Sequence, residues 1–301
     1  MMQCVVARRI GVAFLVSASC CFTFAQSQSS ENQKKILVES FSVSGTKSIA
    51  SAELAEITNV FEGSTFRDDA EELRERLRSQ LQDHGFFNAT IDKLDIKAID
   101  PLASPKPVRI TAEIEEGERC HLSSIEFVGN QALSSETLRS KFPMQIGGEF
   151  KASKVRTGLE KMQSDYGHLG FLNVVSVPKT TFDGAMAKLS IEVREGPQYH
   201  MGTFEVVGPS EISERLQVRW ELQSGAVFDT SYVDDFLKKN SSLLPPDFVR
   251  YNDVALLEDC PDATVSVHIH LNADSQHLAK DREKRIDCKP STETTTNETT
   301  K

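Results

Sequence analysis

A unit of about 80 residues that occurs three times is the feature that most constrains how this 301-residue chain can fold. Three short segments end in a glycine, at Gly45, Gly129 and Gly208. The residues four and two positions before each glycine are apolar, and this alternation is typical of a strand with one buried face. Glycine suits the abrupt turn that follows such a strand. Repetition at a regular interval predicts tandem modules.

Three further landmarks follow in the same order within the units. A Gly-x-x-Phe or Gly-x-Phe phrase precedes a helix-like stretch, and a Gly-Phe phrase closes that stretch at Gly85 and Gly170. Glycine at a helix C-terminus adopts the left-handed conformation at little cost. A strand with strict alternation then ends each unit, which predicts one buried and one solvated face. In the third unit Leu244-Pro245-Pro246 stands where the helix exit is expected, so we expect a short second helix there.

Each unit therefore reads strand, short helix, longer helix, strand, strand. The short helices are expected at residues 51–59, 134–142 and 212–222, and Asp68 with Glu71 is expected to start the first long helix as a capping box. If the first strand runs up, the third also runs up and the second runs down, so the simplest sheet order is one–three–two. The predicted fold class is α+β: three tandem βααββ modules, each a three-stranded mixed sheet covered on one face by two helices.

The two ends of the chain differ in composition from the repeats. Arg8 and Arg9 precede an apolar run and then small residues, which is the order of a secretory signal peptide. The run is short for a bilayer span, but an uncleaved anchor is the alternative. The last segment is polar and threonine-rich, so we expect it to be disordered. The predicted divisions are a signal peptide at 1–25, a flexible segment at 26–35, module 1 at 36–119, module 2 at 120–198, a divergent module 3 at 199–271, and a polar tail at 272–301.

Taken together, these landmarks resemble the POTRA (polypeptide-transport-associated) domain. The resemblance rests on the glycine-ended first strand, the glycine–phenylalanine phrases around the second helix, and the Glu-Gly pair after the third strand of the first two units. The resemblance covers residues 36–271. Three tandem copies of such a domain are similar to the periplasmic arm of outer-membrane protein assembly factors of the BAM and TAM type. The resemblance implies an exported, periplasmic protein that associates with the outer membrane. Only 30 residues follow Leu271 and they do not alternate, so we expect no membrane β-barrel in this chain.

Composition and motifs argue against several classes of function. The formal net charge is −10, whereas nucleic-acid binding needs a basic surface. The sequence has no nucleophile motif, metal motif or phosphate-binding loop, so we expect no enzyme activity, no cofactor and no metal. His268 and His270 share one face of the last strand, where we expect them to face solvent. Glu116 and Glu195 recur at one position of the repeat, which favours a structural role at the joint to the next module over acid–base catalysis.

Cysteine usage is compatible with export. Cys120, Cys260 and Cys288 remain once the expected signal peptide is removed, and the sequence contains no CxxC motif. Three is an odd number, so we expect at least one thiol to be free or to pair between chains.

The predicted functional groups belong to the backbone of the second strand of each module. In the order one–three–two this strand is an open edge, and its unpaired N–H and C=O groups can accept an extended peptide as a further strand. Main-chain recognition tolerates many sequences, as a receptor of unfolded outer-membrane proteins requires. The candidate peptide-binding residues are Thr90, Ile91, Asp92, Lys93 and Leu94 in module 1 and Val174, Val175, Ser176 and Val177 in module 2.

Two functions follow from these expectations. In the first, the chain is a periplasmic polypeptide-binding array in outer-membrane protein assembly or secretion, and it binds unfolded outer-membrane proteins, or a barrel protein of an assembly complex, by β-augmentation. In the second, it is an N-terminally anchored scaffold that spaces other envelope components without binding substrate, and the open edges only meet neighbouring modules. An enzyme site hidden at a module joint has the least support from the sequence.

Overall fold

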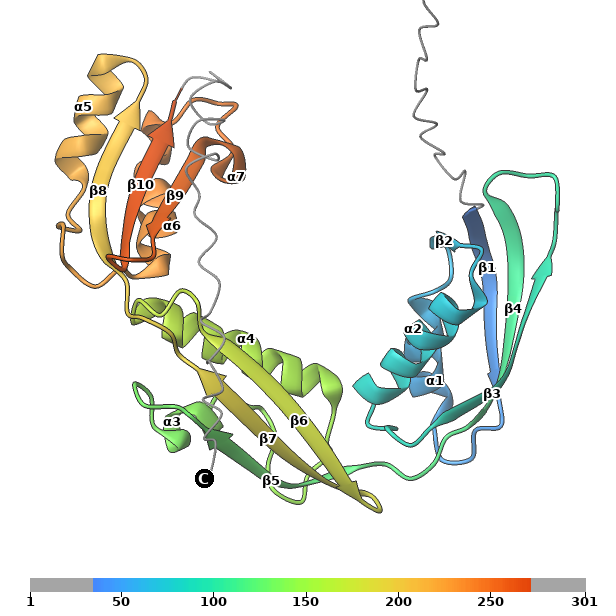
Figure 1. Ribbon diagram of the computed structural model, residues 1–301. Coiled ribbons are helices and arrows are strands. Elements are labelled where there is room, and N and C mark those ends of the chain that lie inside the picture. The colour runs from blue at the N-terminus through green and yellow to red at the C-terminus, as the bar shows by residue number, and fades with distance from the viewer. Residues whose placement is uncertain (1–34, 272–301) are drawn as a thin grey trace, which may run out of the picture.

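The computed structural model describes residues 35–271. Within that range the chain forms three α+β modules in succession, each with its own sheet and its own hydrophobic core (Figure 1). This arrangement confirms the predicted fold class. The expected signal peptide and polar tail lie outside the described residues.

Module 1 has a four-stranded sheet with two helices on one face (Figure 1). Its elements are β1 (Lys35–Ser44), α1 (Ser51–Asn59), β2 (Thr65–Arg67), α2 (Ala70–Asp83), β3 (Thr90–Ala98) and β4 (Lys106–Glu115). The sheet order is β2-β1-β4-β3. The short strand β2, which pairs antiparallel with the start of β1, was not predicted.

Modules 2 and 3 repeat this plan without the extra strand. Module 2 comprises β5 (His121–Val128), α3 (Ser135–Arg139), α4 (Ala152–His168), β6 (Val175–Asp183) and β7 (Met186–Arg194). Module 3 comprises β8 (His200–Val207), α5 (Ser210–Arg219), α6 (Thr230–Lys239), η1 (Ser241–Leu243), α7 (Arg250–Asp253), β9 (Val254–Asp259) and β10 (Thr264–His270). Their sheet orders are β5-β7-β6 and β8-β10-β9.

The strand directions are the same in all three modules. In each module the first and last strands are parallel: β1 with β4, β5 with β7, and β8 with β10. The last strand is antiparallel to the strand before it, which is β3, β6 or β9. With β2 left aside, this confirms the predicted order one–three–two. The second helix has 14 residues in module 1 and 17 in module 2, but α6 of module 3 has only 10. A short second helix was expected there, because prolines follow it closely.

Each core lies between the helices and the sheet. In module 1, Leu73, Leu77 and Leu81 of α2 are fully buried, because positions four apart share one face of a helix. They belong to one cluster with Val108 and Ile110 of the central strand β4. That strand buries every second side chain, as its alternating sequence predicted.

Two glycines let the first strand end close beside the third. Gly45 and Gly129 have φ angles of +89° and +90°. A Cβ atom at these positions would lie 2.0 Å from the carbonyl oxygen of Ile114 and 2.3 Å from that of Val193, respectively. The predicted turn glycines are therefore required by close backbone approach as well as by their positive φ.

The start of α2 differs by one residue from the prediction. Asp69, not Asp68, is the N-cap, and its carboxylate accepts hydrogen bonds from the N–H groups of Glu71 (2.9 Å) and Glu72 (3.4 Å). Asp69 has the extended backbone that immediately precedes the first helical turn. Asp68 instead forms an ion pair with Lys106 at 2.5 Å.

The repeated glutamates have a structural role, but the predicted place for it was wrong. Glu116 accepts hydrogen bonds from the backbone N–H groups of residues 47–49 at 2.9, 2.5 and 3.4 Å. Glu195 accepts them from residues 131 and 132 at 2.7 and 2.9 Å. Each glutamate therefore holds the loop after the first strand of its own module, because the third strand ends beside that loop. Burial raises the pKa of Glu116, but the hydrogen bonds it accepts outweigh burial and leave its pKa below the usual value.

The expectation that His268 and His270 face solvent was also wrong. His270 is only 3 % exposed, and the side chain of His268 is 14 % exposed and lies 3.7 Å from Glu205. Glu205 of the neighbouring strand β8, which is paired in register with His268, covers that side chain.

Candidate functional site

The second strand of every module lies at an edge of its sheet. Among the described residues, β3, β6 and β9 each pair with one neighbouring strand. The edges of modules 1 and 2 are the longer ones, because β3 and β6 have nine residues each and β9 has six. An edge strand leaves every second set of backbone groups without a ladder partner.

Two features of the β6–β7 hairpin determine which backbone groups of β6 point outward. Gly184, with φ of +56°, and Ala185 form a two-residue turn closed by the pair Asp183–Met186, which is a hydrogen-bonded pair in such hairpins. Pro178 lies in the opposite phase, where its missing N–H costs no bond to β7. The residues with outward-facing backbone groups are therefore Ser176, Pro178, Thr180 and Phe182.

Sequence reasoning located β6 but not this alternation. Of the four predicted residues, Ser176 directs its backbone N–H and C=O outward, whereas Val175 and Val177 direct theirs toward β7. Val174 lies before the strand. The available edge lies nearer to the hairpin turn than we expected. Pro178 and the glycine-containing turn are both visible in the sequence and could have given the phase.

An apolar groove of about 240 Å³ lies between β6 and α4. Pro178 and Thr180 line it on the strand side, so the residues that direct backbone groups outward also present side chains to the helix. From α4, Val155 and Leu159 contribute apolar surface, and Arg156 adds a side chain that is 57 % exposed. The groove therefore combines an open backbone edge with a nearby apolar surface.

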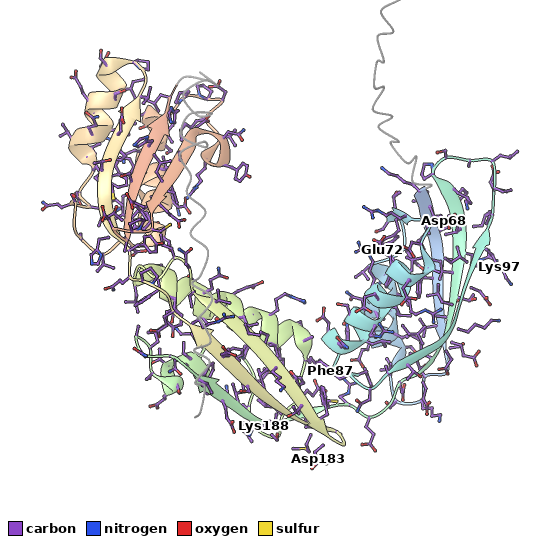
Figure 2. The ribbon with its side chains drawn as sticks, in the orientation of Figure 1. Asp68, Glu72, Phe87, Lys97, Asp183 and Lys188 are labelled. Carbon is purple, nitrogen blue, oxygen red and sulfur yellow. The ribbon has the colours of Figure 1, made fainter. Side chains whose placement is uncertain are left out.

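Phe87 and Phe150 line this groove, and Phe182 packs against both of them. The ring centroids of Phe87, Phe150 and Phe182 lie 4.9, 5.3 and 6.2 Å apart, and Phe182 is 40 % exposed. Phe87 comes from module 1 and lies where module 1 meets module 2 (Figure 2). Its neighbour Phe86 is part of the core of module 1, whereas Phe87 packs against the core of module 2. The sequence analysis did not predict that these two adjacent phenylalanines pack in different modules, although the Phe86-Phe87 pair is visible in the sequence.

The edge of β3 is guarded by charged side chains and a bulge, whereas the edge of β6 carries Pro178 and Lys179. Arg74 of α2 donates a hydrogen bond to the carbonyl oxygen of Ile91 at 2.8 Å. A bulge follows between Ile91 and Lys93, and Lys93 forms an ion pair with Asp95 at 2.9 Å. Charges and bulges are the usual protection of a sheet edge against added strands.

The phase of β3 follows from its far end. Ile99 donates a hydrogen bond to the carbonyl oxygen of Pro107 at 2.9 Å, so alternate residues back along the strand face β4. Those with outward-facing groups are Leu94, Ile96 and Ala98. Of the predicted residues, Leu94 therefore faces outward, Lys93 faces β4, and Thr90, Ile91 and Asp92 lie in or before the bulge.

A hydrogen-bonded joint positions module 1 beside the β6 groove. The N–H of Cys120 donates to the carbonyl oxygen of Gly85 at 2.9 Å, and the N–H of Phe150 donates to that of Cys120 at 2.8 Å. Arg119 donates to Glu53 at 2.8 Å and to a carbonyl oxygen at the end of α2 at 3.0 Å. The hydrogen bond from Arg119 holds the pKa of Glu53 below its usual value, against the opposing effect of burial.

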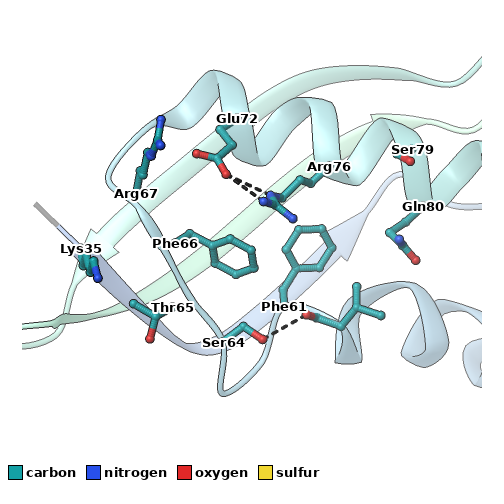
Figure 3. A pocket seen from close by; sticks show the side chains of 11 residues that line it. Lys35, Phe61, Ser64, Thr65, Phe66, Arg67, Glu72, Arg76, Ser79 and Gln80 are labelled. Atoms are coloured by element: carbon teal, nitrogen blue, oxygen red, sulfur yellow. Dashed lines mark hydrogen bonds and ion pairs between the residues drawn. The ribbon is translucent and has the colours of Figure 1, made fainter. Parts of the chain in front are cut away.

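A second cavity, of about 1010 Å³, opens in module 1 beside the start of β1 (Figure 3). It is lined by Phe66 and by the cations Lys35, Arg67 and Arg76. Arg76 forms an ion pair with Glu72 at 3.0 Å, and its guanidinium lies 5.1 Å from the centroid of the Phe66 ring. This cavity is separate from the β6 edge, and its lining combines three cations with Glu72 and with apolar residues that include Val60 and Phe61.

The described residues offer little for metal or redox chemistry. Residues 35–271 contain no group of three or more side chains that could hold a metal ion. Cys120 is a buried free thiol and Cys260 is disulfide-bonded, which confirms that at least one thiol is free. Among the described helices, none has the length and apolar content needed to cross a bilayer.

Comparison with known proteins places the chain among similar modules. The sequence matches the POTRA family, described as "Surface antigen variable number repeat", over residues 36–117 and 121–196. A protein of Treponema pallidum (strain Nichols) named "Putative outer membrane protein assembly factor" is 27 % identical over 169 residues. The match covers 52 % of this chain and 20 % of that protein, so the chain spans about a fifth of the length of this curated relative.

A solved structure has the same fold. The crystal structure of Haemophilus influenzae BamA POTRA3-5 has a TM-score of 0.56 at 17 % sequence identity, and the match covers 79 % of this chain and 96 % of that one. Module 3 lies outside the ranges of the sequence match, but it has the same strand order as modules 1 and 2. The family match spans just over half of the sequence, and the chain belongs to the POTRA family.

Proposed function

We propose that this chain is a periplasmic polypeptide-binding array that acts in the assembly or secretion of outer-membrane proteins. In this proposal the edge of β6 binds an extended segment as an additional strand. The observation that carries the proposal is that the outward-facing residues of β6 also line the apolar groove against α4.

The backbone of β6 supplies the affinity in this proposal. Ser176, Thr180 and Phe182 each offer an outward N–H and an outward C=O, whereas Pro178 offers only its C=O. A guest strand can therefore form a ladder that is interrupted at one donor. Because these are main-chain groups, they select an extended conformation and tolerate many sequences.

The groove supplies the preference for alternating sequences. Side chains of a guest strand alternate between the two faces of the sheet, so every second one would lie over Val155 and Leu159 while the others face water. Strands of outer-membrane barrels alternate in this way between apolar and polar residues. We therefore infer that unfolded outer-membrane proteins, or a barrel protein of an assembly complex, are the partners.

Two observations support the proposed periplasmic location. The Treponema relative is named as an outer-membrane assembly factor, and the expected signal peptide directs export. The alternative is an N-terminally anchored scaffold that spaces envelope components. In that case the hydrogen-bonded joints would hold the modules in place, and the β6 edge would bind nothing.

The experiment that separates the two functions is a peptide titration with a backbone variant. A ten-residue peptide of alternating apolar and polar residues is added to the labelled protein, and its affinity is read from the amide resonances of β6. Thr180→Pro removes one outward N–H and leaves the ladder to β7 intact, so we expect binding to weaken by about tenfold. Thr180→Val keeps that N–H and is expected to bind within about twofold of the parent protein.

A matched variant on the other long edge tests the choice of strand. Ala98→Pro removes an outward N–H from β3 and should leave the affinity unchanged, because we expect the guarded edge not to take part. If β6 resonances do not move at millimolar peptide, the chain is the scaffold instead. Equal weakening by Ala98→Pro and Thr180→Pro would contradict the assignment to β6.

A further inference from the structure

All three modules have one surface in common at the start of the first strand. In each, the Gly-x-x-Phe phrase is held to that strand by the same pair of backbone hydrogen bonds, at 2.7–3.1 Å. Ten positions before the turn glycine stand Lys35, Arg119 and Gln198, so these three residues are structural counterparts. The side chains of Arg119 and Gln198 each donate a hydrogen bond to a carbonyl oxygen at the end of the preceding module's second helix, at 3.0 and 2.8 Å.

In modules 2 and 3 this surface receives the preceding helix end in the same way. The N–H groups of Cys120 and Tyr199 donate to the carbonyl oxygens of Gly85 and Gly170, at 2.9 and 2.8 Å. The last helical residue of the preceding module also finds a polar partner. Asp83 forms an ion pair with Arg156 at 3.0 Å, and His168 is hydrogen-bonded to Asp229 at 2.8 Å.

Module 1 presents the same surface, which we call its receiving face: Lys35, Thr65, Phe66, Arg67 and Glu72. All five line the cavity of about 1010 Å³ (Figure 3). Phe66 is only partly buried, whereas its counterparts Phe150 and Phe228 are 1 % and 0 % exposed beneath the preceding helix end. Figure 2 shows Glu72 and Asp68 at the end of module 1 away from Phe87, which marks the joint to module 2.

We propose that the receiving face of module 1 binds the C-terminal end of a helix of another protein, one that ends in an acidic residue and continues as Gly-aromatic. The repeat supports this occupant, because each counterpart surface holds a helix end that continues to a Gly-Phe phrase. The helix end held by module 2 also terminates in an acid, Asp83, whereas the one held by module 3 terminates in His168.

Charge supports the acid, because Lys35 and Arg67 are exposed cations and Arg67 is the counterpart of Asp229, which pairs with the last residue of the preceding helix. Glu72, the counterpart of Arg156, is itself paired with Arg76 at 3.0 Å. The carbonyl groups at a helix C-terminus are themselves attracted to cations.

A second copy of this chain does not fit as the partner. Its two Gly-aromatic helix exits, at Gly85 and Gly170, already occupy the internal joints. The remaining second helix, α6, ends at Lys239 and continues without a Gly-aromatic phrase. The partner is therefore a different protein that ends in a module of this kind, and its binding is independent of the β6 edge.

The test uses the chain's own helix exit as the probe. A fluorescent peptide of residues 70–89, with Ser79→Lys joined to Glu75 by a lactam to hold the helix, is titrated with the full chain, and fluorescence anisotropy gives the affinity. We expect saturable binding that Arg67→Glu weakens by about tenfold, because a favourable charge contact becomes a repulsive one. Lys97→Glu, an equal charge change on the exposed surface of β3, should leave the affinity unchanged.

A charge swap distinguishes a lost contact from a damaged fold. The probe carrying Asp83→Lys should bind the Arg67→Glu chain better than it binds the parent chain, and the probe carrying Phe87→Ala should bind both weakly. The proposal is overturned by the absence of binding at millimolar probe, or by equal binding to the Arg67→Glu and parent chains. It is also overturned if binding requires removal of residues 1–34, because the occupant is then the chain's own N-terminal segment.

Discussion

The joint between modules 1 and 2 has a partly buried ion pair beside its backbone hydrogen bonds, whereas the joint between modules 2 and 3 has a neutral glutamine and an exposed His–Asp pair beside the same backbone hydrogen bonds. In the first, Arg119 and Glu53 are 24 % and 19 % exposed and lie 2.8 Å apart. In the second, Gln198 occupies the position of Arg119, and the His168–Asp229 pair is 45 % and 40 % exposed. The backbone hydrogen bonds from Cys120 and Tyr199 differ by only 0.1 Å.

The two joints share their main-chain hydrogen bonds and differ in the side chains around them. Main-chain hydrogen bonds and the glycine exit fix how one module follows the next, because those groups are the same in any sequence. The side chains around them then set how strongly each joint resists opening. A partly buried ion pair contributes more than an exposed one, because water screens it less.

The largest expected effect comes from closing the space beside the helix-exit glycines. Gly170→Ala places a Cβ atom 2.7 Å from the carbonyl oxygen of Tyr199 at a φ of +82°, and we expect it to destabilise its joint by about 3 kcal/mol. Gly85→Ala meets its nearest atom at 3.2 Å and should cost about 1–2 kcal/mol. Hydrogen exchange of the Tyr199 and Cys120 amides measures the two openings.

A third glycine serves as the control for backbone strain alone. Gly147 has a φ of +80°, but nothing lies within 4 Å of an added Cβ atom. The free-energy cost of Gly147→Ala should therefore be closer to that of Gly85→Ala than to that of Gly170→Ala. Equal exchange rates in the Gly85→Ala and Gly170→Ala proteins would show that close approach does not distinguish the joints.

Exchanging the residues at the counterpart position comes next in size. Arg119→Gln retains a donor for the helix-end carbonyl but leaves the Glu53 carboxylate without its main partner, so we expect a loss of about 1–2 kcal/mol in the stability of the first joint. The reverse change, Gln198→Arg, supplies a cation at a position whose side chain donates to the carbonyl oxygen of Leu169, while the partly buried acid of this joint, Glu258, contacts Asn173 instead. It should therefore change stability by less than about 0.5 kcal/mol. A larger effect of Gln198→Arg would contradict the comparison.

Acid should weaken the first joint through Glu53. Because Arg119 lowers the pKa of Glu53 below its ordinary value of 4.5, the stabilisation is complete above that pH and is lost as the pH falls through the lowered pKa. NMR titration of the Glu53 carboxyl group should give a midpoint below 4.5, and Arg119→Gln should raise it. A midpoint that Arg119→Gln leaves unchanged would show that the pair does not stabilise the joint.

The smallest effect is expected at the exposed pair of the second joint. His168→Ala removes the hydrogen bond to Asp229, but both side chains are exposed to water, so the cost should stay within about 0.5 kcal/mol. Thermal unfolding, read by the fluorescence of Trp220 in module 3, should shift by no more than a degree or two. A shift as large as that of Arg119→Gln would remove the distinction between the joints.

The elements that the sequence predicted well are those decided by local periodicity. The helix-like stretch that closes at Gly85 is α2, whose Leu73, Leu77 and Leu81 lie at helical spacing and are buried. The alternating strand predicted at the end of the first unit is the central strand β4. The direction of each element then followed from the order of helices and strands, so the open position of the second strand could be deduced from the amino-acid sequence alone.

The features that the sequence did not predict depend on contacts between distant segments. Strand β2 exists because Phe66 reaches back to pair with Ile36, and Phe87 leaves its own module to pack against Phe150. Neither contact has a periodic signal, because each joins residues far apart in the chain. The phase of β6 is different, since Pro178 already indicated which backbone groups point outward.

The most direct test of the central claim is hydrogen exchange of the β6 amides with and without an alternating ten-residue peptide. In the free protein, the outward amides of Ser176, Thr180 and Phe182 should exchange rapidly, while those of Lys179 and Thr181 are protected by β7. The account predicts that saturating peptide slows exchange at the three outward amides and leaves the inward ones unchanged. Bound peptide with the outward amides still exchanging at their free rate would contradict it.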